Sequence, residues 1–353
     1  MIADGTRRPL LAISLGCPGG VGAEVTLRAA LDARRDGAPY RMIAFGDVGL
    51  VRARASAVGA SADDVVEIGS VAEARALDAK LPVLQIGAKL AVETLRAGAP
   101  TREGGAAQLA WLDAACDAVA AGEAEALVTA PVSKHAIVAS GAPGSAGFLG
   151  HTEHLGARLG GFETVMAFVA DALTIALATT HLSIADVPSH LEPRDVARAA
   201  YWTSRLVDAL DVDPSLAVAV LALNPHAGEG GLLGHEERTV IDPGLAEARA
   251  RLAVLGSRRA LVGPLPAESA IRRCARDRAF AACVAMYHDQ ATIPSKLVAF
   301  GDAVNVTLGL PIVRTSVDHG TAYDVAGKGT ADARGMRSAL NLAAKLSRTR
   351  LQP

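Results

Sequence analysis

The feature that most constrains the fold is an alternation of short apolar runs with longer helical segments. Leu10 to Leu15, 125–130 and 216–223 are strongly apolar runs that end at glycine, proline or polar residues. Such runs are typical of strands buried on both faces of a sheet. Segments between them, such as Gly104 to Ala121, carry large apolar residues at helical spacing. Strands that alternate with helices predict an α/β fold with a largely parallel sheet.

One pair of apolar runs departs from this alternation. Thr164 to Val169 and Leu173 to Ala178 are separated only by Ala170-Asp171-Ala172. A connection that short permits only a hairpin, so these two strands are predicted to be antiparallel. We therefore expect mixed, mostly parallel sheets.

Composition limits the class of protein. The chain has 353 residues, half of them apolar, which suggests two or three domains or one large α/β unit. A net charge of -2 and an aromatic content of 3% argue against a nucleic-acid partner. The four cysteines are widely spaced, as in reduced, packed thiols. The N-terminus MIADGTRRPL lacks the apolar core of a signal peptide, and apolar runs fall short of the roughly 20 residues of a membrane span. We expect a cytoplasmic protein without membrane contacts.

Three histidines share one local context. His181, His226 and His288 each follow an apolar run, close to where a strand would leave the sheet. Ligands of open α/β sheets bind beyond the carboxyl ends of strands, where separate side chains can converge. Three neutral imidazoles are a common ligand set for a catalytic divalent metal. The intervals match no short metal motif, and a single histidine in such a place is more often a loop residue or helix cap. The shared context is what favours the metal interpretation.

The stretch from Met286 to Gly329 concentrates side chains that can do chemistry. Asn305 and Arg314 lie inside two apolar runs, Ala303 to Leu308 and Ile312 to Val317, separated by Gly-Leu-Pro. An unpaired charge or amide in a buried strand is costly, which favours a functional interpretation over solvated surface residues. An arginine can clamp an oxyanion with two parallel hydrogen bonds, and a nearby lysine adds a point charge.

The same stretch carries a resemblance to a known family. YHDQ, then Lys296, then NVTLGLPIVRTSVDHGTA followed by AGKG resembles the C-terminal signature of the 4-hydroxythreonine-4-phosphate dehydrogenases of vitamin B6 synthesis. HGTAxDxAGKG is also similar to the nucleotide loop of isocitrate and isopropylmalate dehydrogenases. The early loop GCPGGVG resembles the family motif GDPxGxGPE, but Cys17 stands where Asp is usual and Ala23 where Pro is usual.

The resemblance implies a two-domain α/β/α fold of the isocitrate and isopropylmalate dehydrogenase type, with a cleft between the domains. We expect residues 1–130 plus 305–353 to form a discontinuous domain with the nucleotide-contacting loop. Residues 131–304 are then the second domain, with the metal ligands and the dimer interface. The family also implies a homodimer whose active site lies at the subunit interface and takes metal ligands from both subunits.

The resemblance further implies roles for individual residues. The segments TTHL, LNPHAGEGG and YHDQ supply metal ligands in the family, which assigns that role to His181, His226 and His288. The substrate-binding positions of the family match His151, Thr152, Lys296, Asn305 and Arg314. The cofactor-binding positions are assigned to His319, Gly320, Thr321, Ala322 and Asp324. A general base is also required, and Asp289 and Lys134 are the two candidates.

The implied reaction uses NAD or NADP and one divalent metal, either Zn, Mg or Co. A secondary alcohol β to a carboxylate is oxidised, and the β-keto acid loses carbon dioxide. With 4-phosphohydroxy-L-threonine as the substrate, the product is 3-amino-2-oxopropyl phosphate. One alternative keeps this chemistry but acts on threonate or erythronate 4-phosphate or on a carboxylated cis-dihydrodiol. Alternatives of other classes are a metal-dependent hydrolase, which leaves HGTAxDxAGKG without a purpose, and a non-catalytic binding protein.

Overall fold

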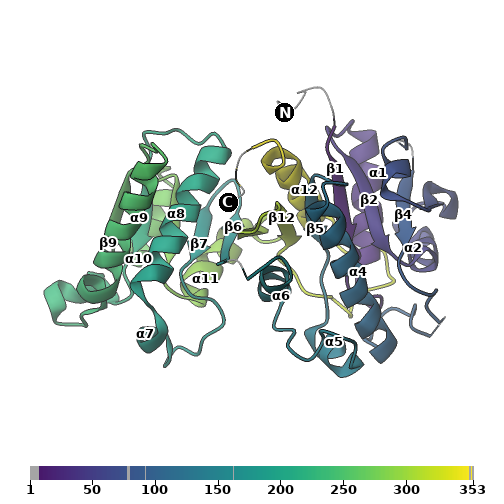
Figure 1. Cartoon of the computed structure of the whole chain (residues 1–353), viewed down its shortest axis with the longest axis horizontal. Coiled ribbons are helices and arrows are strands. Elements are labelled where there is room, and N and C mark those ends of the chain that lie inside the picture. Colours follow the sequence, from purple (N-terminus) through teal and green to yellow (C-terminus); the bar gives the residue numbers. More distant parts are fainter. Residues whose placement is uncertain (1–7, 78–79, 92, 162, 350, 352–353) are drawn as a thin grey trace. The chain divides into compact units, whose positions relative to one another are not determined.

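The computed structural model describes residues 8–77, 80–91, 93–161, 163–349 and 351 (Figure 1). Residues 1–7, which belong to the segment considered above for a signal peptide, lie outside the described residues. The chain divides into two compact units. Unit 1 comprises Met1–Phe162 and Leu310–Gln352, and unit 2 comprises Glu163–Gly309. Each unit is described by itself below.

Unit 1 is built on a parallel sheet. Its described strands are β1 (Leu10–Ser14), β2 (Arg41–Gly46), β3 (Val65–Ile68), β4 (Leu81–Gln85), β5 (Ala126–Thr129) and β12 (Arg314–Val317). They are ordered β3-β4-β2-β1-β5-β12, and every described pairing among them is parallel. The predicted parallel sheet is therefore confirmed in this unit.

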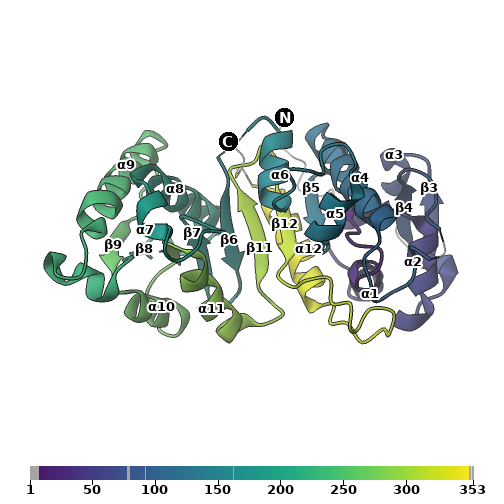
Figure 2. The ribbon, with the colours of Figure 1, turned by 90° about the horizontal axis from the view of Figure 1, so that it is seen from below.

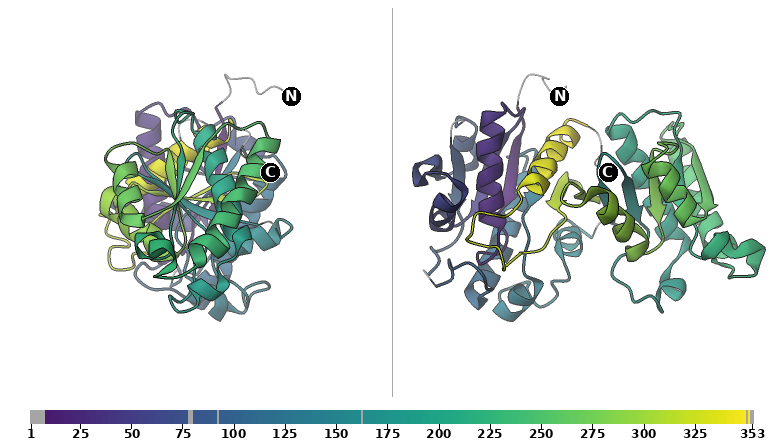
Figure 3. Two further views of the ribbon diagram at one scale, coloured as in Figure 1. Left: turned by 90° about the vertical axis from the view of Figure 1, so that its left-hand side faces the viewer. Right: turned by 180° about the vertical axis from the view of Figure 1, so that it is seen from behind.

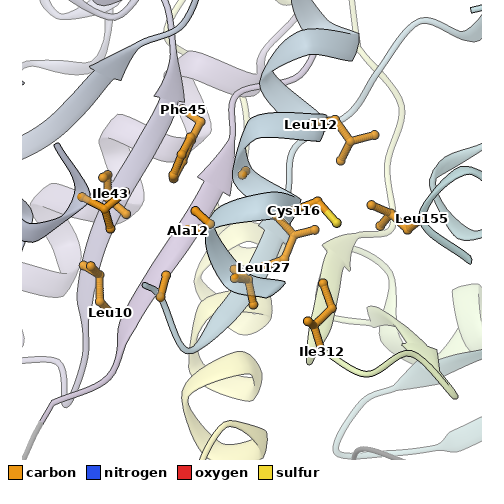
Figure 4. Packing of buried hydrophobic residues seen from close by; sticks show 14 of the residues in the cluster. Leu10, Ala12, Ile43, Phe45, Leu112, Cys116, Leu127, Leu155 and Ile312 are labelled. Atoms are coloured by element: carbon orange, nitrogen blue, oxygen red, sulfur yellow. The ribbon is translucent and has the colours of Figure 1, made fainter. Parts of the chain in front are cut away.

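Helices cover both faces of this sheet. They are α1 (Gly22–Arg35), α2 (Val48–Arg54), α3 (Val71–Ala74), α4 (Arg102–Ala120), α5 (Lys134–Ser140), α6 (His151–Arg158) and α12 (Arg334–Leu346), with the short turns η1 (Ser56–Val58) and η2 (Ala62–Asp64). Helix α4 packs on one face, while α1 and α12 lie together on the other (Figure 2; Figure 3, right). Under α4, its residues Leu112 and Cys116 pack with Leu10 and Phe45 of the sheet in one apolar core (Figure 4).

The boundary of unit 1 differs from the domain boundary expected from the sequence. Residues 131–162 belong to unit 1, although we expected them in the second domain. The reason is packing: Ile137, Phe148 and Leu155 are part of the core under α4. Helix α5 also packs directly on α4. The return to unit 1 near the C-terminus occurs at Leu310 rather than at residue 305.

Unit 2 has a mixed sheet. Its described strands are β6 (Val165–Val169), β7 (Thr174–Leu177), β8 (Val218–Leu221), β9 (Leu261–Leu265), β10 (Ala282–Ala285) and β11 (Val304–Leu308). They follow the order β11-β6-β7-β10-β8-β9. Strand β6 is antiparallel to both β11 and β7, and the remaining pairings are parallel. The predicted hairpin of β6 and β7 and the mixed, mostly parallel α/β class are thus confirmed.

Two layers of helices flank the sheet of unit 2. The helices are α7 (Val187–His190), α8 (Pro193–Ala209), α9 (Asp242–Val254), α10 (Ala267–Ala275) and α11 (His288–Ala299), with the turns η3 (Pro225–Gly231) and η4 (Glu237–Ile241). Helices α8 and α9 pack together on one face, and α10 and α11 on the other (Figure 2).

These topologies decide where the candidate functional residues lie. Parallel strands end at the same edge of a sheet, so the loops after β1, β5 and β12 gather at one edge of unit 1. In unit 2, the loops after β7, β8 and β10 do the same. The four cysteines are buried and free, as predicted. Among the described residues, no helix has the length and apolarity that crossing a bilayer requires.

Candidate functional site

The ends of β7 and β10 are tied together in unit 2, and each leads to a histidine. The backbone N–H and the hydroxyl of Thr179 both donate to the carbonyl of Met286, at 3.2 and 2.6 Å. His181 and His288 follow within two residues, and their ring centroids are 5.7 Å apart. The structure therefore brings together two of the three predicted metal ligands.

A cavity of about 240 Å³ opens beside this histidine pair. It is lined by Thr180, His181, Leu182, Ile184, Tyr287, His288 and Asp289. Asp289 Oδ1 lies 2.7 Å from His288 Nδ1. An ionised carboxylate only accepts hydrogen bonds, so Nδ1 carries the proton and Nε2 keeps its lone pair for a ligand. Asp289, predicted as a possible base, thus orients a predicted ligand in this structure.

His226 lies apart from that pair within one chain. It belongs to η3, where the backbone is left-handed from His226 (φ 52°, ψ 29°) through Gly230. Among the residues that the structure describes, no group of three or more His, Cys, Asp or Glu side chains is arranged to hold a metal ion. The assignment of His226 as the third ligand therefore stays a prediction.

The left-handed loop is held by residues that the sequence analysis did not identify. Left-handed backbone costs a non-glycine residue roughly 1–2 kcal/mol, so the surroundings must stabilise it. The Glu237 carboxylate accepts hydrogen bonds from the backbone N–H groups of Leu223 and Asn224, at 3.0 and 2.8 Å. Gln290 donates to the Ala222 carbonyl at 2.8 Å and thereby links the end of β8 to α11. Gln290 belongs to the motif YHDQ and could have been identified from it, whereas no sequence motif pointed to Glu237.

Two further predicted substrate residues lie in unit 2. Lys296 is exposed on α11, and Asn305 is half-buried in β11. The side-chain oxygen Oδ1 of Asn305 is buried and has no hydrogen-bond partner among the described residues. Such an acceptor is destabilising unless a ligand or water satisfies it. Asn305 therefore fits a substrate hydroxyl or amino group.

Arg314 is a buried cation in unit 1. Its residue is only 2% exposed in β12, and Nη2 donates to Thr129 Oγ1 of the neighbouring strand β5 at 2.7 Å. Burial lowers the pKa of Arg314 to about 9, while the charge of Glu153 acts in the opposite direction. A guanidinium taken out of water in this way interacts strongly with an arriving oxyanion.

His151 begins α6 beside that arginine. Burial, together with the charges of Arg314, His154 and Lys134, holds the pKa of His151 well below its usual value. The ring is therefore neutral near pH 7. Its Nε2 is buried and has no hydrogen-bond partner in the described part of the chain. The next residue, Thr152, is also buried. The imidazole thus offers an unused polar atom next to a buried cation, which fits a substrate oxygen or amine.

A late loop of unit 1 is anchored on its first helix. Glu24 in α1 is 1% exposed and accepts hydrogen bonds from the backbone N–H groups of Gly327 and Gly329, the latter at 3.1 Å. The N–H of Val21 donates to the carbonyl of Thr321 at 3.0 Å. The loop after β1 and the loop after β12 therefore form one connected structure.

The predicted cofactor residues lie in this anchored loop. His319 Nδ1 donates to the Gly320 carbonyl at 2.9 Å, and Nε2 is buried with no partner among the described residues. A Cβ at Gly320 would meet no atom within 4 Å, so this backbone faces open space. Ala322 has a φ of 46°, and Asp324 is exposed. The loop thus offers an unsatisfied ring nitrogen and accessible backbone, which suits a nucleotide.

Cys17 makes a contact between the same two loops. Its Sγ lies 3.3 Å from the hydroxyl of Tyr323, and the thiol is buried. Burial, with a contribution from this contact, raises the pKa of Tyr323. Cys17 stands where the family motif GDPxGxGPE has Asp. At this position the chain therefore has a thiol–phenol contact between the loop after β1 and the loop after β12. Ala23, the second departure, is buried in α1.

The Glu24 anchor generates a testable prediction. Glu24→Gln keeps one acceptor oxygen but loses the other, so one of the two glycine N–H groups loses its partner. We expect a loss of about 1–3 kcal/mol in local stability. Amide hydrogen exchange at 318–330 should become faster by about 5- to 150-fold. Asp277→Asn, which removes an exposed carboxylate paired with Arg272, is the matched control. Unchanged exchange in Glu24→Gln would show that the anchor does not hold the loop.

Comparison with known proteins identifies the family. Residues 39–343 match the family model of the pyridoxal phosphate biosynthetic protein PdxA. A 4-hydroxythreonine-4-phosphate dehydrogenase from Trichlorobacter lovleyi is 38% identical, covering 98% of this chain and 99% of the relative. A Cutibacterium acnes protein, named as a candidate D-threonate 4-phosphate dehydrogenase, is 36% identical over 97% of this chain and 95% of its own length.

A solved structure agrees with these relatives. The crystal structure of a 4-hydroxythreonine-4-phosphate dehydrogenase from Burkholderia phymatum matches with a TM-score of 0.75 and 34% identity. The match covers 96% of this chain and 98% of that one. The resemblance inferred from YHDQ and HGTAxDxAGKG is thereby confirmed. With the family model matching most of its length, the chain belongs to the PdxA family of pyridoxal phosphate biosynthetic proteins.

Proposed function

We propose that this protein oxidises 4-phosphohydroxy-L-threonine with NAD or NADP and releases carbon dioxide to give 3-amino-2-oxopropyl phosphate. The reaction is a step in the synthesis of pyridoxal 5'-phosphate. The main structural support lies in unit 1, where buried Arg314 lies beside a neutral His151 whose Nε2 has no partner among the described residues. Full-length relatives with this activity in their names support the same substrate.

Within each unit, the predicted substrate residues suit the role assigned to them. In unit 1 Arg314 suits an oxyanion, and in unit 2 Lys296 offers a positive charge. Asn305 and His151 each offer a buried polar atom without a partner among the described residues, which suits the hydroxyl and amino groups of the substrate. Thr152, buried next to His151, contributes its hydroxyl.

The residues also fit the expected metal and nucleotide. His288 presents Nε2 because Asp289 occupies Nδ1, and His181 lies beside it at the same cavity. We assign these two histidines and His226 to one divalent cation, Zn, Mg or Co. His319, Gly320, Thr321, Ala322 and Asp324 are assigned to the nucleotide. When bound, the nicotinamide accepts the electrons of the alcohol, and the cation polarises substrate oxygens.

The two candidate bases have different surroundings. Asp289 is engaged in orienting His288, and we assign it that role. Lys134 begins α5, directly after β5, and its Nζ is 3.5 Å from the position that a Cβ on Gly150 would take. Lys134 thus belongs to the same edge of unit 1 as His151 and Arg314. We propose that Lys134 Nζ, once it has lost its own proton, accepts the substrate hydroxyl proton.

We also propose that the active molecule is a homodimer. Helix α11 carries large exposed apolar side chains four residues apart, with Ile293 57% and Leu297 80% exposed, and Phe300 directly after the helix is 79% exposed. Leu182 and Ile184, which line the histidine cavity, are exposed as well. Contiguous apolar surface of this kind marks protein interfaces. Because His226 does not join His181 and His288 within one chain, a second copy can complete the ligand set.

A second candidate function is oxidation of D-threonate 4-phosphate. It is favoured by one observation, the Cutibacterium acnes relative at 36% identity. That substrate has a hydroxyl where 4-phosphohydroxy-L-threonine has an amino group. Both carry a phosphate and a carboxylate, so the anion-binding residues serve either one.

Turnover of the two substrates distinguishes these candidates. With metal and NAD or NADP present, kcat/KM for 4-phosphohydroxy-L-threonine should exceed that for D-threonate 4-phosphate by at least about tenfold, because a buried polar site discriminates between an amino group and a hydroxyl. Formation of reduced nicotinamide, followed by absorbance, is the measurement. The opposite ranking would establish the second candidate. Turnover of neither substrate would refute both.

Removal of a predicted ligand tests the metal site. His288→Ala should abolish turnover and bound metal together, with the metal quantified by elemental analysis after dialysis. Asp289→Asn should lower metal affinity by about 10- to 100-fold, because it removes the acceptor that orients His288. His190→Ala, a surface histidine bonded to the Asp186 carbonyl, is the control and should retain both properties. A metal-free but fully active His288→Ala protein would contradict the assignment.

Disruption of the apolar face of α11 tests the dimer. Leu297→Asp places a charge in the proposed interface, where burying it without a partner is unfavourable. We expect the mass measured by light scattering to fall from that of two chains to that of one, with loss of bound metal. Val254→Asp is the matched control, since Val254 is 89% exposed at the end of a different helix. A Leu297→Asp protein that remains dimeric would exclude this face as the interface.

A further inference from the structure

Another cavity, of about 270 Å³, lies in unit 1 and serves none of the roles assigned above. Its lining includes Arg41 and Leu81, the first residues of β2 and β4. Because the strands of this sheet are parallel, they begin at the edge opposite to the one where β1, β5 and β12 end. A five-residue strand such as β1 spans roughly 17 Å. The cavity is therefore separate from the residues of unit 1 that are assigned to the substrate and the nucleotide.

Positive side chains predominate around this cavity. Arg8, Arg34, Arg41 and Lys80 line it, and Asp64 is the one acidic residue of its lining among the residues that the structure describes. Four positive charges and one negative charge give a formal net charge of +3, although the whole chain carries -2. A concave surface lined by one sign of charge raises the local concentration of ions of the opposite sign. The cavity therefore attracts anions.

Backbone structure places these cations. The N–H of Arg41 donates to the carbonyl of Pro9 at 2.8 Å, which holds the residue after Arg8 against the start of β2. Arg34, near the end of α1, pairs with Asp64 at 3.2 Å between Nη1 and Oδ1, so this carboxylate is used by a cation of the same lining. An arginine can bind a phosphate group through two parallel hydrogen bonds. The cavity therefore has the donors that phosphate recognition requires.

The lining also has an apolar part. Leu27, Tyr40, Met42 and Leu81 line the cavity and are buried. Gly37 lines it as well, and a Cβ there would meet no atom within 4 Å, so this turn leaves open space. The cavity is slightly smaller than the roughly 300–1,000 Å³ of typical small-molecule pockets, which suits a compact ligand rather than a dinucleotide. A ligand with an apolar body would gain affinity by removing that body from water.

We propose that this cavity is a binding site for a small phosphate monoester that carries an apolar body. A phosphate monoester bears about -1.5 to -2 charges at pH 7 and balances most of the excess positive charge, which a monocarboxylate does not. The phosphate contacts the guanidinium groups of the lining, and the apolar body lies against Leu27, Met42 and Leu81. The site is independent of the proposed function, whose substrate has a polar body and is assigned to other residues.

Phenyl phosphate is the probe, with inorganic phosphate and phenol representing its two halves. Amide hydrogen exchange of the full chain, followed by mass spectrometry, localises binding, because a ligand slows exchange where it stabilises the folded state. Phenyl phosphate should slow exchange at 27–42 in a saturable manner. Inorganic phosphate should need at least about tenfold higher concentration for half-maximal protection, since it buries no ring. Phenol should give no protection at the concentration where phenyl phosphate saturates.

Substitutions in the lining test the charge and the space separately. Arg8→Gln/Lys80→Gln changes residues that precede β1 and β4, and should raise the half-saturating concentration of phenyl phosphate by at least about tenfold. Arg272→Gln/Arg276→Gln removes the same charge from an exposed part of unit 2 and is the matched control, which should bind like wild type. Ala30→Phe fills the cavity from α1 without changing its charge and should also weaken binding by at least about tenfold.

The proposal fails if wild type shows no protection at 27–42 with millimolar phenyl phosphate, or if protection is confined to 314–330, which would place the probe near Arg314 instead. It also fails if inorganic phosphate protects 27–42 as well as phenyl phosphate does, if either folded cavity variant binds like wild type, or if the control variant weakens binding equally. Protection at 27–42 that only the cavity variants weaken would establish the site, whether or not the protein turns over either proposed substrate.

Discussion

Parallel pairing of strands is the constraint on which this structure depends. Each parallel strand must end at the same edge of its sheet as its neighbours, whatever the distance along the chain. In unit 2 this rule places Thr179 beside Met286, and the histidines that follow are brought to within 5.7 Å between ring centroids. In unit 1 it places β12 beside β5, where Arg314 Nη2 donates to Thr129 Oγ1 at 2.7 Å. The backbone hydrogen bonds between paired strands therefore bring these functional side chains together.

Buried glutamates then fix the loops that leave these edges. Glu24 accepts from Gly327 and Gly329, and Glu237 accepts from Leu223 and Asn224. A carboxylate has several acceptor positions, so one side chain can satisfy two backbone N–H groups that lie outside regular strands. The loops are therefore ordered by charge-assisted hydrogen bonds, which polar loop backbone needs when it is not paired in a sheet.

Much of the framework could be predicted from the sequence because it depends on local patterns. Apolar runs located strands such as β1, β5 and β8, and the three-residue connection between β6 and β7 required a hairpin. Helix α11 was not predicted, since it contains Pro294, which normally interrupts a helix. The placement of 131–162 in unit 1 depends on which core accepts Ile137 and Leu155, and that is a property of packing between distant segments.

The residues of the candidate site also divide into those whose placement local sequence patterns predicted and those whose placement they did not. Positions close to strand ends predicted that His181 and His288 meet, because strand pairing alone brings them together. His226 lies in a loop whose backbone is left-handed. The direction of the chain through such a loop cannot be predicted from the periodicity of apolar residues.

The charge state of His151 links the pocket to the choice of substrate. A protonated imidazole beside Arg314 and Lys134 would make three neighbouring cations and would repel the ammonium group of a hydroxy-amino acid. Burial and those two cations instead hold His151 neutral, so one ring nitrogen can accept a hydrogen bond from an amine or hydroxyl. Arg314, to which we assign the substrate oxyanion, thus also keeps its neighbour compatible with a positively charged substituent. Two cations beside a neutral imidazole are compatible with a zwitterionic phosphate ester, whereas three cations would favour purely anionic substrates.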